Sequence, residues 1–439
     1  MSWHLIVKIG AADFYTPTVA SDEPRVLVSI DNPGDTFSIR NNLFKEVEKR
    51  ASLNPSSLAV DLVNFAIAIY TADLKISRSL SEDRWTRDLV VHLPVANLDV
   101  WTRSRELAQE MLGFLTGDHW DFRFRQYECY EKWYVASSNA PTVDVVSLLS
   151  GGLDSLVGAI DLLEEGKNVA FISHYGAGMT KSFQDNVLRA LENEYSGLIT
   201  SYSFYVQPPK KQTGSGEPSM RSRSILFLML GTFVASLFSD KVPLIAAENG
   251  LISLNIPLTS ARMGSLSTRT THPYFIDLYR KFLGSISLPS FVELPYRFQT
   301  KGEMFEQVRN PEVLKKMVSL TMSCSHPESG RYLGKQPGNH CGYCVPCIIR
   351  RASLAAVGLD NNNYNIDILT EEPAYDTDRG RDFRAFQIAV ERYRTLNSKV
   401  SLFDVLESGP LPPEDIQEYV AMYSRGMDEV RNFLEPTLS

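Results

Sequence analysis

One segment near the middle of the chain restricts the possible folds more than any other. Residues 143–166, VDVVSLLSGGLDSLVGAIDLLEEG, lead from an apolar β-branched stretch through Ser150–Ser155 directly into a helix-forming stretch. The glycines allow a tight turn close to a ligand, and a helix start offers unpaired N–H groups and a positive dipole end. This order predicts a strand, an anion-binding loop and a helix. A Gly-Gly turn capped by Asp or Ser is the simpler alternative.

Asp154 adds a condition to this anion site because its carboxylate would repel a phosphate. A Mg²⁺ ion that bridges Asp154 to the phosphates gives the carboxylate a role. The loop therefore predicts a nucleotide bound together with a metal ion. No G-x-x-x-x-G-K-[ST] sequence occurs in the chain, which argues against a kinase or GTPase that acts at the γ-phosphate.

The stretches that follow the loop alternate between strand and helix, and this alternation predicts an α/β fold with a doubly wound parallel sheet. One expected helix begins near Asp154, and two others cover Lys181–Glu194 and Ser224–Phe238. The expected strands are Val143–Leu149, Val169–Ser173, Ser201–Val206, Leu244–Ala247 and Phe291–Leu294.

Three domains are expected in the 439 residues. Residues 1–138 alternate short strands and helices and predict an N-terminal mixed α/β domain for partner or substrate recognition. A polar stretch that ends at Pro141 precedes the second domain, 142–358, which contains the anion loop. Residues 359–439 predict a C-terminal helical extension, with amphipathic stretches at 382–395 and 413–435.

Composition limits the partners and the location. The net charge is −8, with 44 Lys and Arg against 52 Asp and Glu, so no overall positive field would attract a nucleic acid. The N-terminus does not resemble a signal peptide, and the longest apolar run, Ile225–Phe238, is too short to cross a bilayer. We therefore expect a cytoplasmic protein that does not enter a membrane.

Four of the five cysteines form a cluster in the sequence. Cys324 precedes Cys341, Cys344 and Cys347, which follow one another as C-x₂-C-x₂-C. This grouping is typical of a structural Zn²⁺ site in which all four positions are filled by thiolates. His326 and His340 are less favoured alternative ligands, and unpaired core cysteines are the alternative without a metal. Cys129 has no partner in the sequence and is interpreted as a structural thiol.

The SGGLDS loop resembles the signature of the PP-loop ATP pyrophosphatases, which cleave ATP between the α and β phosphates and transfer AMP to a substrate oxygen. The resemblance implies that the leaving pyrophosphate is held by the loop, and that Asp154 and Ser155 take part in catalysis. It assigns nucleotide binding to six consecutive residues: Ser150, Gly151, Gly152, Leu153, Asp154 and Ser155.

Together with the cysteine set, the loop resembles the QueC family, the 7-cyano-7-deazaguanine synthases, over residues 143–357. Tyr175 and Gly176 are similar to a nucleotide-binding turn of the family, and Arg223 is similar to an arginine at its helix entry. The family adenylates 7-carboxy-7-deazaguanine with ATP, adds ammonia to give an amide, and activates that amide to the nitrile. The resemblance thus implies ATP, Mg²⁺ and Zn²⁺ as cofactors and an AMP-forming ligase activity.

The chain departs from the family in its substrate wall and in its flanks. Residues 248–255 and 267–273 replace the family's Tyr-Pro-Asp-Cys-Arg type segment, and Ser224 stands where the family has Asn. The added N- and C-terminal regions look like those of QueC-like proteins of bacterial anti-phage systems such as the Qat system. This resemblance implies that an activated deazaguanine carboxylate is transferred to an amine on a partner protein of the same system.

Two other functions remain open at this point. One is synthesis of 7-cyano-7-deazaguanine (preQ0) itself with ammonia, and the other is a nucleotide-binding scaffold without turnover. A tRNA-thiolating enzyme is disfavoured by the acidic balance and the single spare cysteine. A glutamine-dependent amidotransferase would begin with a nucleophilic cysteine, whereas this chain begins Met-Ser-Trp.

Several residues after the fourth expected strand are candidates for substrate binding. Glu248 and Asn249 follow that strand, and in doubly wound sheets the carboxyl ends of the strands line the ligand crevice. Arg262 and Arg269 could neutralise pyrophosphate, and His272 lies in a polar run suited to a phosphate or a nucleobase. The alternatives are an Asx turn with a solvated Glu for the first pair and surface positions for the others.

Arg223 is a candidate catalytic residue for an electrostatic reason as well. It stands at the start of an apolar helix, where a positive charge opposes the helix dipole unless an anion lies nearby. This conflict favours a ligand-binding role for Arg223.

Overall fold

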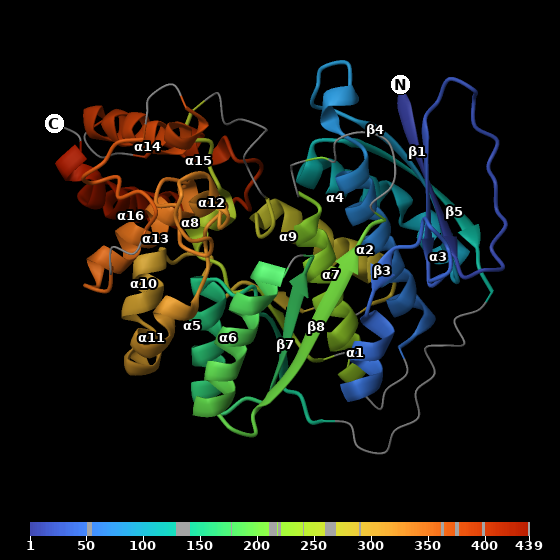
Figure 1. Cartoon of the computed structure of the whole chain (residues 1–439), viewed down its shortest axis with the longest axis horizontal. Helices are drawn as coiled ribbons and strands as arrows, with labels where there is room; N and C mark the ends of the chain where they lie inside the picture. The colour runs from blue at the N-terminus through green and yellow to red at the C-terminus, as the bar shows by residue number, and fades with distance from the viewer. Residues whose placement is uncertain are drawn as a thin grey trace.

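The computed structural model places three layers of structure along the long axis of the molecule (Figure 1). A four-stranded sheet from the N-terminal region lies at one end, a six-stranded sheet lies in the middle, and the C-terminal helices lie at the other end. The structure describes residues 1–50, 55–128, 141–176, 178–209, 217, 221–239, 241–259, 269–288, 291–360, 364–373, 377–396 and 400–437.

The N-terminal sheet is parallel throughout, in the order β2-β1-β4-β5. The strands at Ser2–Ile9, Arg25–Ile30 and Asp88–Val95 coincide with stretches rich in β-branched residues, whereas the strand at His119–Gln126 was not expected from the sequence. The strands are β1 (Ser2–Ile9), β2 (Arg25–Ile30), β4 (Asp88–Val95) and β5 (His119–Gln126), and the helices are α1 (Leu43–Arg50), α2 (Ser57–Lys75), α3 (Leu98–Arg103) and α4 (Arg105–Thr116).

The central sheet has the order β10-β9-β6-β7-β8-β3. Its first five strands are parallel, which confirms the predicted parallel sheet, and β3 pairs antiparallel with β8 at one edge. The strands are β3 (Arg40–Asn41), β6 (Val145–Leu148), β7 (Val169–Tyr175), β8 (Ile199–Gln207), β9 (Leu244–Ile245) and β10 (Val292–Glu293).

Helices cover both faces of the central sheet. α5 (Leu153–Glu164) and α6 (Gly178–Glu194) pack on one face together with α10 (Lys301–Glu306) and α11 (Pro311–Met317), whereas α7 (Arg223–Phe238) packs on the other. After β6, the chain adds β7 and β8 on one side of this strand and then β9 and β10 on its other side. The strand order therefore reverses between β6 and β9. In such sheets ligands bind outside the carboxyl ends of the strands at that point.

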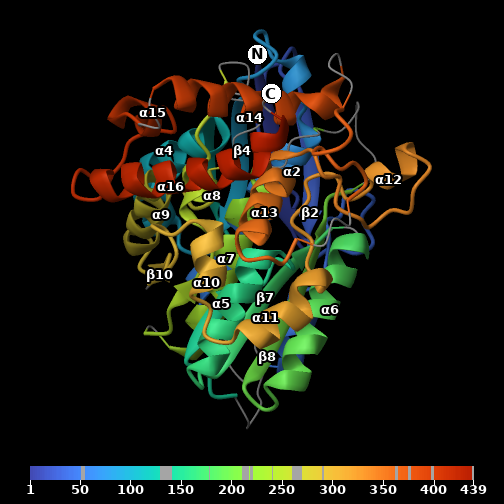
Figure 2. The same cartoon turned by 90° about the vertical axis from the view of Figure 1, so that its left-hand side faces the viewer.

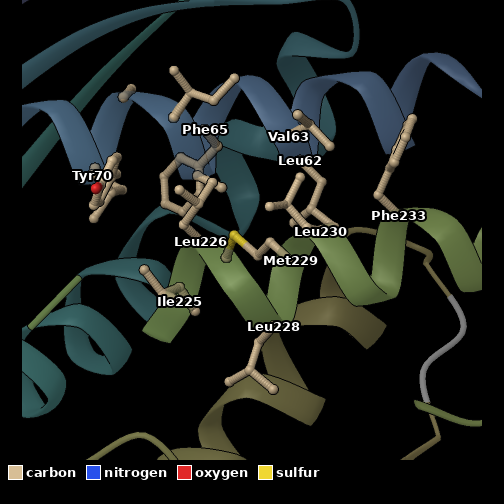
Figure 3. Packing of buried hydrophobic residues seen from close by; sticks show 14 of the residues in the cluster. Leu62, Val63, Phe65, Tyr70, Ile225, Leu226, Leu228, Met229, Leu230 and Phe233 are labelled. Atoms are coloured by element: carbon tan, nitrogen blue, oxygen red, sulfur yellow. The ribbon is translucent and has the colours of Figure 1, made fainter. Parts of the chain in front are cut away.

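The N-terminal region and the central sheet share one hydrophobic core. α2 lies between the N-terminal sheet and α7, and the two helices run antiparallel with Leu62 and Phe65 of α2 facing Leu226 and Leu230 of α7 (Figure 3). Among the described residues α2 is the helix long and apolar enough to cross a membrane, but most of it is buried inside the protein. This packing is that of a helix in the core of a folded protein.

Buried charges join the same two regions. Asp118 accepts hydrogen bonds from the guanidinium groups of Arg78 and Arg87, and Arg87 also donates to Asp73 at 2.7 Å. Asp73 in turn accepts from the backbone N–H and hydroxyl of Ser222, the residue that precedes α7. A carboxylate of the N-terminal region therefore lies at the N-terminal end of α7, where negative charge is favourable.

The C-terminal helices lie together at this end of the molecule (Figure 2). Their buried apolar side chains form a second core with those of the cysteine segment. α13 (Val345–Ala356) packs against α16 (Ile416–Leu434), and α8 (Gly250–Leu254) also contacts α16. The remaining α-helices are α8 (Gly250–Leu254), α9 (Pro273–Ser285), α12 (Ser329–Tyr332), α13 (Val345–Ala356), α14 (Asp378–Thr395), α15 (Leu402–Leu406) and α16 (Ile416–Leu434).

Candidate functional site

The SGGLDS loop joins the carboxyl end of β6 to α5, as its sequence predicts. Gly151 has φ +83°, a conformation that favours glycine, and an added Cβ there would lie 3.2 Å from the Gln184 side chain. Gly152 is the N-cap of α5 without a side-chain cap, and the hydroxyls of Ser150 and Ser155 lie 3.1 Å apart beside it. Among the described residues no protein group accepts the backbone N–H of Asp154 or Ser155. These N–H groups and hydroxyls suit an anion.

Asp154 is held by residues from two other elements. The Asn249 side-chain amide donates to Asp154 Oδ2 at 2.7 Å, and the ammonium of Lys301 lies 2.9 Å from Oδ1. Lys301 is almost fully buried at the start of α10, and Asn249 is fully buried after β9. A buried lysine is costly unless it is paired, so the ion pair with Asp154 holds Lys301 beside the loop.

Glu248 lies at the carboxyl end of β9, next to this group. Its carboxylate accepts a hydrogen bond from the Thr271 hydroxyl, which also lies 2.9 Å from the Ser253 hydroxyl. Burial raises the pKa of Glu248 to about 7, and the charge of Asp154 acts in the same direction, whereas Thr271 and Lys301 act against it. Both predicted carboxylates therefore come together at the reversal of strand order, and Asn249 also caps α8 by accepting from the Ile252 N–H.

Tyr175, Gly176 and Arg223 lie at the carboxyl end of β7. The guanidinium of Arg223 donates to the His174 carbonyl at 3.4 Å, and the Tyr70 ring of α2 packs edge-on against the His174 ring. Burial lowers the pKa of Arg223. The charge conflict expected at this helix start is relieved by Asp73, so it no longer argues for a bound anion. The proposed role of Arg223 rests on its contact with the His174 carbonyl, to which Gln184 beside the loop also donates.

His272 and Arg269 make protein contacts in this structure. His272 is fully buried as the N-cap of α9, where Nδ1 accepts from the Tyr274 N–H and Nε2 lies 3.1 Å from the Ser408 hydroxyl. Arg269 donates to the Phe114 carbonyl at 2.8 Å and lies over the Phe114 ring. Arg262 and Cys129 lie outside the described residues.

The four cysteines form the second part of the site. Their Sγ atoms all lie within 4.8 Å of one another, with Cys324–Cys344 at 3.9 Å and Cys341–Cys347 at 3.8 Å. A tetrahedron with metal–sulfur bonds of ~2.3 Å has edges of about 3.8 Å, so the set fits Zn²⁺, and all four thiols are free of disulfides. Backbone N–H groups of His326 and Cys341 donate to Cys324 Sγ, as expected around a thiolate. The geometry confirms that the cysteines gather as a possible metal site.

Oxygen ligands suitable for Mg²⁺ are also present. Asp154 and Glu248 present carboxylates at the ends of neighbouring strands, and Mg²⁺ is bound through one or two carboxylates together with substrate phosphates. Lys301 already supplies one positive charge to Asp154, so a metal ion would bind through the remaining lone pairs of the carboxylates.

Lys301 and Gln184 were not found from the sequence, and Thr271 lies in the polar run before His272 but was not singled out there. Lys301 and Thr271 complete the group around the carboxylates, and Gln184 of α6 donates to the carbonyls of Ser150 and His174, so it ties the ends of β6 and β7 together. The Thr300–Glu303 capping box marks the start of α10, but the burial of Lys301 depends on tertiary packing.

Comparisons of the chain with protein-family models, with curated proteins and with solved structures found no match.

Proposed function

We propose that this protein is a QueC-like, AMP-forming ligase that adenylates a 7-deazaguanine carboxylate, such as 7-carboxy-7-deazaguanine, with ATP. The single observation that carries the proposal is the SGGLDS loop at the reversal of strand order, where Asp154 pairs with Lys301 and two helix-start N–H groups have no acceptor among the described residues. This arrangement suits a phosphate chain, and it lies at the position where doubly wound sheets bind ligands.

In the proposed first step, a carboxylate oxygen of the substrate attacks the α-phosphorus of ATP and the bond to the β-phosphate bridging oxygen breaks. The N–H groups of Asp154 and Ser155 would donate to the leaving pyrophosphate, and the hydroxyls of Ser150 and Ser155 would do so after turning away from each other and from the Gly152 carbonyl. Lys301, and Arg223 after reorientation, would balance its charge. When bound, Mg²⁺ would neutralise phosphate charge beside Asp154.

In the second step a neutral amine nitrogen attacks the acyl carbon, the bond to the AMP oxygen breaks with its electron pair leaving on AMP, and the nitrogen releases a proton to the solvent to give an amide. We place this amine on a partner protein of a cytoplasmic bacterial anti-phage system, because the N-terminal sheet and the C-terminal helices add surfaces beyond the central fold. Zn²⁺ would be held by the four cysteines without taking part in the chemistry.

The test is pyrophosphate release from ATP in the presence of 7-carboxy-7-deazaguanine, with and without the partner protein. Asp154→Ala removes the carboxylate beside the loop and should abolish release. An adduct of deazaguanine mass on the partner would support conjugation, whereas a free nitrile would identify a 7-cyano-7-deazaguanine synthase. ATP binding without pyrophosphate release under every condition would leave a scaffold and refute the ligase.

A further inference from the structure

A short segment joins the cysteine site to the anion loop. Residues 321–324, called the strap below, run past the loop just before Cys324. The backbone N–H of Met322 donates to the Gly151 carbonyl at 2.8 Å, and the Ser323 hydroxyl accepts the Leu153 N–H at 3.4 Å. An added Cβ on Gly152 would lie 3.7 Å from Ser323 Oγ, so strap and loop are in close contact.

Both ends of the strap are anchored to the cysteine segment. At its start, Arg350 of α13 donates to the Thr321 hydroxyl at 2.8 Å, and the same helix carries Cys347. At its end, Cys324 is itself one of the four thiols, and its Sγ accepts the Cys341 N–H at 3.2 Å. The buried His340 beside Cys341 accepts the Ser323 N–H at 3.3 Å. The strap therefore has few ways to move while the four sulfurs are held together.

The strap contacts divide the polar groups of the loop into two sets. Met322 and Ser323 bind Gly151 and Leu153, whereas the N–H groups of Asp154 and Ser155 have no protein acceptor among the described residues. The strap thus fixes the start of α5 and leaves the next two N–H groups for a ligand.

We propose that the strap couples the two sites: metal binding at the four cysteines holds Ser323 and Met322 against the loop and so strengthens phosphate binding there. Ser323 is a positioning residue in this proposal. The proposal rests on the proposed function in one respect, since it takes the loop ligand to be the phosphate chain of ATP.

The physical reason is that a metal–sulfur bond would hold Cys324 more firmly than the hydrogen bonds that its Sγ accepts from the N–H groups of His326 and Cys341. The four thiols form no disulfide, and without a metal the buried sulfurs are joined only by weak hydrogen bonds. Loss of the metal therefore frees the end of the strap and lets the loop sample other conformations, which lowers the fraction competent to bind.

The first experiment measures binding of the α,β-methylene analogue of ATP, with excess Mg²⁺, by calorimetry. This analogue cannot be cleaved between the α and β phosphates, so turnover does not affect the result. Zinc-loaded protein is compared with protein stripped by a chelator that is then removed. We expect the dissociation constant to rise at least about fivefold on stripping, at the lower end of usual coupling between sites. Equal affinities would overturn the proposal.

Because stripped protein can lose structure around the cysteines, Ser323 variants give a second measurement with the metal in place. Ser323→Ala removes the acceptor for the Leu153 N–H and should weaken analogue binding about three- to tenfold, the range for one hydrogen bond. Ser323→Thr keeps a hydroxyl and should restore binding. Ser329→Ala is the control: Ser329 is a serine of the same cysteine segment, buried where Ser323 is half-buried, and its hydroxyl accepts from Asn365 and does not contact the loop.

Coupling must also act in the reverse direction. The analogue should slow zinc release to a colorimetric chelator in the wild-type chain and in Ser329→Ala, but much less in Ser323→Ala. Equal slowing in all three chains would refute the strap as the link. If zinc-loaded wild-type protein does not bind the analogue at all, the proposed function fails. If the analogue binds with a dissociation constant that depends on neither zinc nor Ser323, only the coupling is refuted.

Discussion

The buried histidine at the start of α9 gives a sharp test of the structure through pH. His272 Nδ1 accepts the Tyr274 N–H, so this nitrogen must be unprotonated and Nε2–H faces the Ser408 hydroxyl. A second proton would place N–H against N–H and a charge in a fully buried position near Arg269. Burial, assisted by Arg269, therefore lowers the pKa of His272 to about 3.

The direction in which pH changes the free energy of unfolding depends on how tightly the folded and the unfolded chain bind a proton at His272. The unfolded chain takes up a proton at this histidine below about pH 6.5, whereas the folded chain resists it down to a pKa of about 3. Unfolding is thus favoured as the pH falls through this window. At pH 5 the loss in free energy of unfolding is about 2 kcal/mol relative to pH 7.5.

The assay is urea unfolding of the wild type and of His272→Asn at pH 7.5 and pH 5. Asparagine can accept the Tyr274 N–H as an N-cap but does not titrate. The stability lost between the two pH values should be smaller by about 2 kcal/mol in the variant, since the other buried histidines and the cysteine site contribute equally to both chains. Equal losses would refute the assigned tautomer and burial.

Three further predictions concern the loop, the cysteines and the buried charges. Gly151→Ala forces a side chain into the φ +83° conformation against Gln184, so ATP affinity should fall about tenfold by calorimetry, and unchanged affinity would contradict the loop geometry. Cys347→Ala should reduce bound zinc from about one equivalent to a small fraction by elemental analysis, and full retention would argue against the four-thiolate site. Asp118→Asn leaves two buried guanidinium groups without their shared carboxylate charge and should lower the unfolding free energy by about 3–5 kcal/mol; a loss below about 1 kcal/mol would contradict the buried network.

The parallel sheet and the cysteine cluster could be predicted from the sequence because both depend on local patterns. β6, β7 and β8 are runs of β-branched and aromatic residues separated by helical stretches, and cysteine spacing reports directly on a metal site. β3 was not predicted because two residues carry no periodic signal, and its pairing with β8 is a long-range contact. β5 was not predicted either, although Trp120, Phe122 and Phe124 alternate with polar residues along it.

The site residues divide in the same way. Asp154 was found from the SGGLDS loop motif, and Glu248 was found because it follows an expected strand, whose carboxyl end lines the ligand crevice in a doubly wound sheet. Lys301 was not found because nothing local indicates that its ammonium is buried beside Asp154. A ligand role was predicted for His272 from the polar residues around it, but the following Pro273 at the first helical position signals an N-cap instead.

The packing of α2 against α7 also has a consequence for synthesis of the chain. α2 ends at Lys75, and α7, which covers its apolar side, begins only at Arg223. At ~5–20 residues per second, the ribosome needs on the order of ten seconds to deliver the second helix after the first. During that interval α2, which is long and apolar enough to span a membrane, is not yet covered by α7 in the growing chain. We expect nascent chains stalled before Arg223 to engage hydrophobic-binding chaperones and to release them once residues through Phe238 have emerged.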